Sequence, residues 1–351
     1  MEKKNPYTIS FGKIPARYLG RNSIIDSIVE AFESDEPDEQ AFKLTGIRGT
    51  GKTVTLTAIE RHFRDRKDWV VVNLAPDSDM IVKLVAELYS CVGFVTEFVD
   101  TNLNLSAFGI GTGLSRKSPV ASADHALEVL LKELKKKKVR LMVSIDEAHK
   151  TPGIIHFIQE FQILIRKELP IYLLAAGLYE DIESLENTDG LTFFWRASKY
   201  EMTPLNITYI RDDYMKTLGI SFDEAQKAAF LTKGYAYAYQ ALGKYLWDSD
   251  KHILTDDVLR YLDDVLFEKV YKKIWSELAP KDRWFLSFII KKDNMPVTEL
   301  LEITKSTHSQ WSVPRNRLKE KRIIDVRERG VISLSLPRFK EFVENRILME
   351  D

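Results

Sequence analysis

The spacing of apolar residues between positions 20 and 204 changes repeatedly from a helical period to short uninterrupted runs. These runs lie at residues 41–45, 69–74, 141–145, 171–176 and 199–202. Short apolar runs separated by helices are typical of strands in a parallel sheet whose two faces are both buried. The pattern therefore predicts an α/β domain over residues 1–204, with a parallel sheet at its centre.

Further along the chain, the Val- and Ile-rich runs stop and helical spacing takes over, for example over residues 235–247. This predicts a helical subdomain over residues 205–265. Residues 266–351 predict three helices and then a β-hairpin, with strands at 322–326 and 331–336. Helices followed by such a hairpin are typical of a winged helix-turn-helix, so we expect a third domain of that class.

One segment within the predicted α/β domain fits two structures. Residues 99–114 include a stretch of alternating polar and apolar residues at 102–106 and three glycines further on. These features are compatible with a hairpin and equally with a loop, and both alternatives stay open from the sequence.

The composition is that of a folded protein without a membrane anchor. Hydrophobic residues make up 44% of the 351 residues and charged residues 29%, which suffices for a sizeable core. The single cysteine, Cys91, excludes intramolecular disulfides and zinc sites built from several cysteines, as is usual in a reducing compartment. The N-terminus lacks the apolar stretch of a signal peptide, and we find no apolar run of about 18 residues. We therefore expect a cytoplasmic protein with no membrane partner.

A glycine-rich segment follows the first predicted strand and precedes a predicted helix. It reads Gly-Ile-Arg-Gly-Thr-Gly-Lys-Thr and fits the P-loop pattern Gly-x4-Gly-Lys-[Ser/Thr], also called Walker A. Glycines let successive backbone N–H groups point at a phosphate, and the helix N-terminus adds about half a positive charge there. We expect Lys52 to contact the β- and γ-phosphates and Thr53 to offer its hydroxyl to Mg²⁺. The expected nucleotide-binding residues are Gly46, Arg48, Gly49, Thr50, Gly51, Lys52 and Thr53.

A second motif lies at the end of the third predicted strand. The apolar run 141–145 is followed by two adjacent carboxylates, Asp146 and Glu147, in a Walker B pattern. We expect Asp146 to hold Mg²⁺ and Glu147 to polarise the water that attacks the γ-phosphate. One side chain cannot perform both tasks, so the pair favours hydrolysis over binding alone.

With these motifs, the chain resembles AAA+ ATPases of the bacterial and archaeal branch near the origin-recognition initiators, over nearly its whole length. Besides the Walker A and Walker B motifs, the matching segments are residues 15–21, 176–178, 194–197 and 234–240. The resemblance implies a P-loop domain and a helical lid, followed by a C-terminal winged helix.

The resemblance also implies roles for individual residues. Those that would line the adenine pocket are Tyr18, Leu19, Gly20 and Arg21. Arg196 would be an arginine finger that reaches the γ-phosphate of a neighbouring subunit, with a surface or structural arginine as the alternative. The implied ligands are ATP, ADP and Mg²⁺, and the ATP-bound protein would form a homo-oligomer or bind a protein partner.

Two positions depart from the family pattern. Residues 175–178, at the end of the fourth predicted strand, carry no polar sensor residue. The lid segment 234–237 reads Gly-Tyr-Ala-Tyr where the family has an arginine. We therefore expect slow hydrolysis, or altered coupling between hydrolysis and the lid, which suits a switch better than a motor.

Charge is distributed unevenly along a chain whose net charge is −1. Residues 266–351 carry 18 Lys and Arg against 13 Asp and Glu. The basic residues expected to contact double-stranded DNA are Arg315, Arg317, Lys319, Arg327 and Arg329. Pro314 is expected to interrupt the recognition helix, predicted over residues 306–319, and to place Arg315 at a helix start.

Three functions fit these observations. The first is an AAA+ ATPase whose nucleotide state controls assembly and, through the winged helix, DNA engagement. The second is a slow signalling switch that uses the winged helix for protein contacts. The third is a P-loop protein that binds nucleotide without hydrolysing it. Salt-dependent DNA affinity, and stimulation of hydrolysis by DNA, separate the first from the second.

Overall fold

The computed structural model describes residues 4–10, 14–19, 21–90, 123–249 and 252–350. The chain packs into two compact units. The first, here called the sheet unit, comprises Ser23–Thr45 and Lys52–Glu201. The second, here called the helical unit, comprises Met1–Asn22, Gly46–Gly51 and Met202–Asp351. Cys91 and the segment 99–114 lie outside the described residues.

The sheet unit is built on five parallel strands, each within one residue of the predicted bounds. They are β1 (Ala41–Thr45), β2 (Trp69–Leu74), β3 (Arg140–Ile145), β4 (Ile171–Gly177) and β5 (Ser198–Glu201). Their order across the sheet is β2-β3-β4-β1-β5, and every neighbouring pair is parallel. Strand β4 therefore lies between β1 and β3, the strands that precede the Walker A and Walker B motifs.

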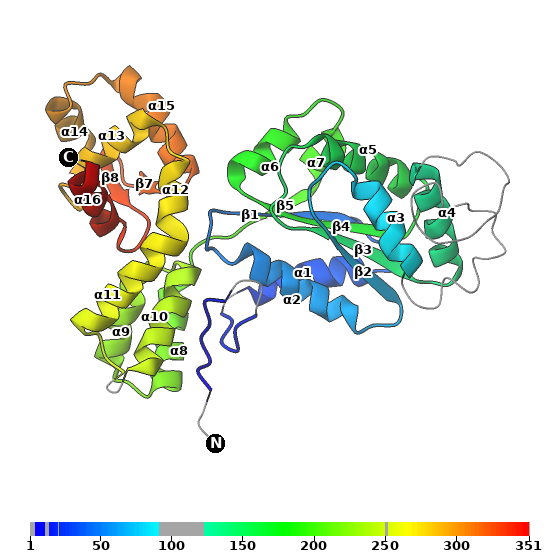
Figure 1. The fold of residues 1–351 in the computed structure, drawn as a ribbon, viewed down its shortest axis with the longest axis horizontal. Coiled ribbons are helices and arrows are strands. Elements are labelled where there is room, and N and C mark those ends of the chain that lie inside the picture. The colour runs from blue at the N-terminus through cyan, green and yellow to red at the C-terminus, as the bar shows by residue number, and fades with distance from the viewer. Residues whose placement is uncertain (1–3, 11–13, 20, 91–122, 250–251, 351) are drawn as a thin grey trace. The chain divides into compact units, whose positions relative to one another are not determined.

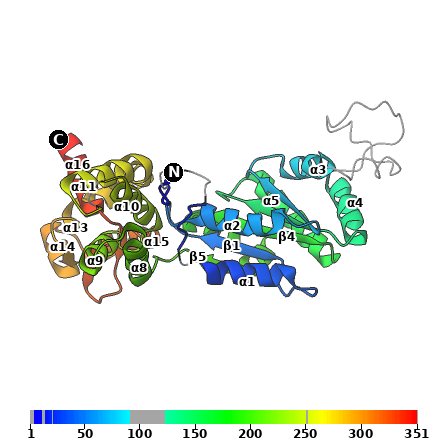
Figure 2. The ribbon, with the colours of Figure 1, turned by 90° about the horizontal axis from the view of Figure 1, so that it is seen from below.

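Helices cover both faces of this sheet (Figure 1). They are α1 (Asn22–Glu33), α2 (Lys52–Arg64), α3 (Met80–Ser90), α4 (Ala123–Lys136), α5 (Pro152–Arg166), α6 (Tyr179–Glu186) and α7 (Thr192–Arg196). Helices α1 and α2 lie along one face, which is turned toward the viewer in Figure 2. On that face, Phe32 and Phe63 pack against Trp69 and Tyr172 of the sheet. This aromatic cluster fixes α2, whose first residues belong to the Walker A motif.

The opposite face of the sheet carries an apolar core shared with α3 to α7, and one lysine points into that side. Lys43 of β1 is 1% exposed. Its Nζ donates hydrogen bonds to Glu186 Oε1 at 2.7 Å and to the Phe194 carbonyl at 2.5 Å. Burial lowers the pKa of Lys43, whereas its hydrogen bond to Glu186 raises it. The buried ammonium is therefore stabilised by one carboxylate and by the backbone of α7.

The helical unit has one continuous core. Its first helices are α8 (Ile207–Leu218), α9 (Phe222–Leu231), α10 (Ala236–Asp248), α11 (Asp256–Leu266) and α12 (Lys272–Ser276), with a π-helical turn, Phe267–Tyr271, between the last two. Because α11 runs through this turn into α12, the predicted boundary between residues 265 and 266 falls inside a helix. Leu262 and Tyr271, on either side of that boundary, belong to the same buried cluster.

The N-terminal segment of the helical unit is fixed on α8 and α10. The hydroxyls of Tyr7 and Tyr239 both donate to Asp213 Oδ2 at 2.7 Å. Burial, together with the Asp213 carboxylate, raises the pKa of both tyrosines, so they remain hydrogen-bond donors. Gln240 Nε2 donates to the Arg17 carbonyl at 2.6 Å. These contacts hold the segment that leads to the expected adenine pocket.

The C-terminal part of the helical unit is a winged helix, as predicted. Its elements are α13 (Pro280–Ile289), β6 (Asn294–Pro296), α14 (Val297–Ile303), α15 (His308–Glu320), β7 (Ile324–Asp325), β8 (Val331–Leu334) and α16 (Phe339–Glu350). The three strands form a small sheet in the order β6-β8-β7, in which β7 and β8 are antiparallel. The expected hairpin is thereby confirmed.

The expectation that Pro314 interrupts the recognition helix is wrong. Helix α15 is continuous from His308 to Glu320 and includes Pro314. A capping box between Thr307 and Gln310 satisfies backbone groups at its start, and the buried side chains of Trp311 and Pro314 fix its inner face. The loss of one backbone donor at Pro314 is thus tolerated, and Arg315 lies in the interior of the helix.

No helix among the described residues combines the length and apolar character needed to cross a membrane.

The pairing of Lys43 leads to a prediction about stability. Glu186→Gln should lower the free energy of unfolding by about 3 kcal/mol, because it leaves a buried ammonium without its anion. Lys199 also contacts Glu186, at 3.0 Å, but is 45% exposed. Lys199→Met, the matched control, should therefore cost less than about 1 kcal/mol. Equilibrium urea unfolding of both variants tests this, and equal costs would show that burial of Lys43 is not what makes Glu186 important.

Candidate nucleotide site

The Walker A loop, Gly46–Gly51, joins β1 to α2, so the expected strand, loop and helix are present in that order. Gly49 and Gly51 have φ angles of +76° and +93°. This left-handed region favours glycine over residues with a Cβ. At Gly49 a Cβ would also overlap the hydroxyl of Tyr235. Helix α2 begins at Lys52, so the N-terminus of the helix directly follows the loop.

The start of α10 contacts the Walker A loop through hydrogen bonds to two consecutive carbonyls. The Tyr235 hydroxyl donates to the Arg48 carbonyl at 2.5 Å, and the Tyr237 backbone N–H donates to the Gly49 carbonyl at 3.0 Å. Burial raises the pKa of Tyr235, so its hydroxyl stays protonated and acts as a donor. The Arg48 guanidinium forms an ion pair with Glu277, which follows α12, at 3.1 Å. We call these three interactions the lid contact.

Arg21, expected in the adenine pocket, braces the backbone in this structure. Its side chain is buried, and its NH2 group donates to the Thr203 carbonyl at 2.5 Å and to the Thr50 carbonyl at 3.4 Å. Tyr18 and Leu19 are half-buried, and Gly20 lies outside the described residues. The role of this segment in binding a base remains a prediction.

The Walker A and Walker B motifs meet at the carboxyl edge of the sheet. Thr45 pairs in register with Gly177, and Ile145 pairs in register with Ala175, so β1 and β3 end beside the same stretch of β4. Across this edge, the Thr53 hydroxyl donates to Asp146 Oδ2 at 2.7 Å. The two residues expected to hold Mg²⁺ are therefore in direct contact.

Glu147 lies just beyond Asp146 in an unusual backbone conformation. Its φ is +53°, which is uncommon for a residue other than glycine and is often found at functional sites. Its N–H donates to Asp146 Oδ1 at 2.9 Å, and the next residue, Ala148, donates to the Ala176 carbonyl at 2.7 Å. This arrangement ties the segment back to β4 and leaves the Glu147 side chain exposed. A carboxylate in that position is accessible to a water molecule.

The residues present fit a magnesium nucleotide. Thr53 supplies a hydroxyl and Asp146 a carboxylate, which are the hard oxygen ligands that Mg²⁺ prefers, and they lie 2.7 Å apart. Lys52 lies at the first position of α2, where its charge adds to that of the helix N-terminus. The two oxygen ligands suit a metal ion, and the positive charge of Lys52 suits the phosphate chain.

Arg196, expected as an arginine finger, is the last residue of α7 and is exposed. Among the residues that the structure describes, its guanidinium has no hydrogen bond or ion pair. The backbone that precedes it is held by Lys43, whose Nζ donates to the carbonyls of Phe194 and Trp195 at 2.5 and 3.3 Å. The buried lysine thus positions an exposed arginine at the surface of the sheet unit.

The two departures from the family pattern are visible in the structure. Ala175, Ala176 and Gly177 end β4 without a polar side chain, and at Gly177 a Cβ would lie 2.5 Å from the Ala148 carbonyl. On the lid, Tyr237 stands where the resemblance implies an arginine, and its backbone contacts Gly49. Backbone and tyrosine groups therefore occupy positions for which the family pattern has polar or charged side chains.

The five basic residues of the winged helix differ in what their side chains contact. Arg315 is half-buried, whereas Lys319 and Arg329 are exposed. Arg317 donates three hydrogen bonds to the buried carboxylate of Asp282, at 2.5, 2.9 and 3.2 Å. Arg327 is exposed but pairs with Asp325 at 2.8 Å. Arg317 therefore has a structural contact within the winged helix, and the DNA role of all five residues remains a prediction.

Three residues with structural roles could not be identified as such from the sequence motifs, two near the nucleotide site and one in the winged helix. Lys43 was detectable as a charged residue inside an apolar run, which signals a buried partner. Tyr235 lies in a matched lid segment, but nothing in its identity indicates a hydrogen bond to Arg48. Asp282 comes from a helix distant in sequence from Arg317, so its pairing requires the fold.

Comparisons with known proteins agree with this architecture. The structure of Cdc6p from Pyrobaculum aerophilum is 17% identical, with 97% of each chain covered and a TM-score of 0.50. The ORC2 protein of Aeropyrum pernix, in its ADPNP–ADP complexes, is 12% identical, again with 97% of each chain covered, at a TM-score of 0.58. Its ADP form is 11% identical, with the same coverage and a TM-score of 0.51. The chain thus shares the overall fold of these archaeal proteins over nearly its whole length.

Sequence comparisons add little to this fold assignment. A family model described as a domain of unknown function (DUF8462) matches residues 268–343, which include most of the winged helix. No curated protein matches the sequence.

The contact between Arg317 and Asp282 leads to a second stability prediction. Arg317→Ala should cost about 2 to 3 kcal/mol, because it leaves a buried carboxylate unpaired, with some solvent screening on the arginine side. Lys319→Ala, an exposed change on the same helix, is the matched control and should cost less than about 0.5 kcal/mol. Urea unfolding followed by tryptophan fluorescence measures both, since Trp311 is buried on α15. An equal effect of the two changes would contradict the structural role of Arg317.

Proposed function

We propose that this protein binds ATP at the Walker A loop and hydrolyses it slowly, as a nucleotide-dependent switch. The observation that carries the proposal is the hydrogen bond between Thr53 and Asp146 at the carboxyl edge of the sheet. It brings together two motifs that are far apart in sequence, in the arrangement that a metal-bound phosphate chain requires. The AAA+ fold supports the same conclusion.

Each residue of the site has a distinct task in this proposal. The loop N–H groups and Lys52 bind and orient the phosphate chain. Glu147 accepts a proton from water while the water oxygen bonds to the γ-phosphorus and the bond to the β,γ-bridging oxygen breaks, leaving ADP and phosphate. Mg²⁺, when bound by Thr53 and Asp146, neutralises charge on the phosphates.

Arg196 makes the proposed activity dependent on assembly. Its exposure and its anchoring by Lys43 support a role toward a second subunit. An arginine supplied in trans stabilises charge on the transferring phosphoryl group and can contribute about 10³-fold or more in rate. The isolated chain is therefore proposed to turn over slowly, and a homo-oligomer or a partner complex to turn over faster.

The lid contact supports a switch rather than a motor. The Arg48 carbonyl accepts the hydrogen bond from Tyr235, and it shares one peptide unit with the N–H of Gly49. Because this peptide is trans, the carbonyl and the N–H point in opposite directions. A phosphate that accepts a hydrogen bond from such an N–H polarises the carbonyl on the other side of the unit. Phosphate binding and lid position are thereby linked through the backbone, without the arginine that the family pattern supplies.

DNA engagement through the winged helix is the second part of the proposal. Lys319 lies on the recognition helix and Arg329 in the turn between β7 and β8, and both side chains are exposed, where a winged helix meets the phosphate backbone. Because Arg317 and Arg327 have acidic partners, the free positive charge is smaller than the sequence indicates. We therefore propose modest, salt-sensitive affinity.

Two substitutions test binding and hydrolysis separately. Lys52→Ala should weaken ATP binding about 10²-fold, because charge-assisted hydrogen bonds to phosphate are lost. Glu147→Gln should keep ATP affinity and lower turnover by about 10² to 10⁴-fold, since the general base is removed. Calorimetric titration measures affinity, and phosphate release measures turnover.

Glu168→Gln is the matched control for Glu147, because Glu168 is also an exposed glutamate with a positive φ, of +55°. It should leave turnover unchanged. Turnover of the Glu147→Gln variant at the wild-type rate would reject the catalytic assignment and favour a protein that binds nucleotide without hydrolysing it.

DNA binding is tested by titrating a duplex at several salt concentrations. We expect the logarithm of the binding constant to fall linearly with the logarithm of the salt concentration. The double substitution of Lys319 and Arg329 by alanine should reduce this slope by about 2. Absence of duplex affinity, or affinity without salt dependence, would instead favour the signalling switch that uses the winged helix for protein contacts.

A further inference from the structure

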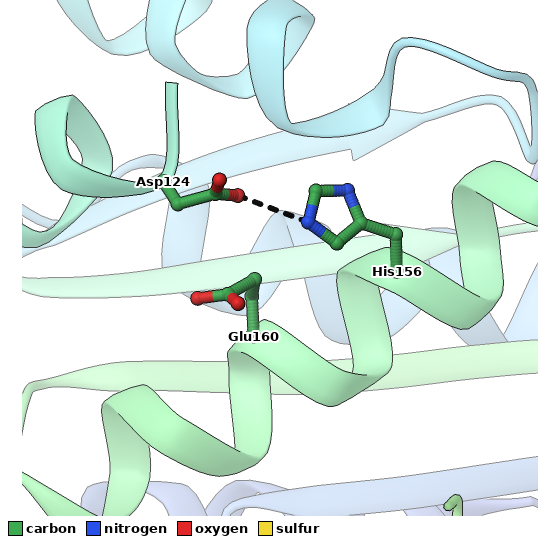
Figure 3. A group of neighbouring side chains, drawn as sticks. All are labelled: Asp124, His156 and Glu160. Carbon is green, nitrogen blue, oxygen red and sulfur yellow. Dashed lines mark ion pairs between the residues drawn. The ribbon is translucent and has the colours of Figure 1, made fainter. Parts of the chain in front are cut away.

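A second group of polar side chains lies on the sheet unit, on helices that carry none of the nucleotide-site residues. Asp124 is in the first turn of α4, and His156 and Glu160 are on α5 (Figure 3). One ligand atom from each side chain lies within 4.8 Å of the other two. Among the described residues, this is the only group of three histidine, cysteine or carboxylate side chains with that spacing.

The geometry of the group matches a set of metal ligands. His156 and Glu160 are four residues apart, so they lie one above the other on the same face of α5. The Nε2 atom of His156 is 3.2 Å from Asp124 Oδ1. Adjacent ligands of a tetrahedral zinc ion with bonds near 2.0 Å are about 3.3 Å apart, so this distance fits one edge of the tetrahedron. The third ligand atom, a carboxylate oxygen of Glu160, lies within 4.8 Å of both.

One atom of the group is buried and lacks a hydrogen bond. Asp124 Oδ1 is inaccessible to solvent and has no hydrogen-bond donor among the residues that the structure describes. A buried carboxylate oxygen without a donor is costly unless a cation is bound there. The ion pair with His156 supplies a cation only when the imidazole is protonated, whereas the neutral imidazole is the form that binds metals.

The acidic side chains on α4 and α5 differ in how their charges are balanced by neighbouring basic groups. Glu128, one turn beyond Asp124, contacts Lys132 at 2.7 Å and Lys167 at 2.8 Å, and these two ammonium groups lower its pKa to about 2. By contrast, among the described residues Asp124 forms an ion pair only with His156, and Glu160 forms none. The two carboxylates therefore share a single imidazole as their neighbour in the group, and His156 is the one ion-pair partner among the described residues.

We propose that Asp124, His156 and Glu160 bind a divalent first-row transition metal, best represented by Zn²⁺, which fastens the start of α4 to α5. An imidazole nitrogen with two carboxylate oxygens favours zinc and its neighbours over Mg²⁺ or Ca²⁺, which take oxygen ligands. Water completes the coordination. This site is separate from the ATP site and does not depend on it.

The test uses untagged full-length protein without nucleotide, in buffer that contains excess Mg²⁺. Titration with Co²⁺ should produce the visible absorption of a protein-bound ion at one equivalent, and Zn²⁺ should displace it. Saturating Zn²⁺, at about 100 times its dissociation constant, should raise Tm by about 4 °C, because the metal binds only the folded state. His156→Gln and Glu160→Gln should each weaken Co²⁺ binding by at least about tenfold.

The matched control is His62→Ala. His62 also pairs with a carboxylate, that of Glu33, at 2.8 Å. Among the described residues, however, no third histidine, cysteine or carboxylate side chain lies within 4.8 Å of both. It should leave Co²⁺ affinity and the Zn²⁺-induced shift of Tm unchanged. Failure of wild-type protein to bind Co²⁺ or Zn²⁺ at one equivalent would overturn the proposal, as would unaltered affinity in a folded His156→Gln variant. Neither result would affect ATP binding, which is measured in the same preparations as a check of folding.

Discussion

The candidate site depends on the register in which β1 and β3 end on either side of β4. A parallel sheet covered by helices on both faces leaves its carboxyl edge for polar chemistry. At that edge, Thr45 is level with Gly177 and Ile145 with Ala175, so the residues that follow β1 and β3 converge. The hydrogen bond from Thr53 to Asp146 is the direct consequence. The positive φ of Glu147 follows from the same edge, because the chain turns back to β4 through Ala148.

The second constraint acts within the helical unit, where the Walker A loop is held by residues from the lid and beyond. Tyr235 and the backbone of Tyr237 bind its carbonyls, and Glu277 binds Arg48. Glu277 comes directly after the continuous helical segment formed by α11, the π-helical turn and α12. Buried residues of this segment belong to the same core as those of the winged helix. The loop that we propose to bind phosphate is therefore packed against the elements that a nucleotide switch has to move.

Most of the architecture could be predicted from the sequence, because strands buried on both faces produce apolar runs that are hard to mistake. The Walker motifs could also be predicted from the sequence, because a glycine-rich segment after one strand and paired carboxylates after a later strand rarely occur together for another reason. Contacts between segments that are distant in sequence could not be predicted. Tyr235 with Arg48, and Arg317 with Asp282, involve common residue types at large sequence separation. The prediction at Pro314 was wrong because the capping box and the burial of Trp311 outweigh the low helix propensity of proline.

Magnesium-dependent nucleotide binding can be measured by calorimetric titration of the unmodified protein with ATP, once in Mg²⁺ and once in EDTA. We expect saturable binding at one site per chain, with clearly lower affinity after chelation, because Thr53 and Asp146 then lack the ion that joins them to the phosphates. Absence of saturable binding in Mg²⁺, or an affinity that chelation leaves unchanged, would contradict this expectation.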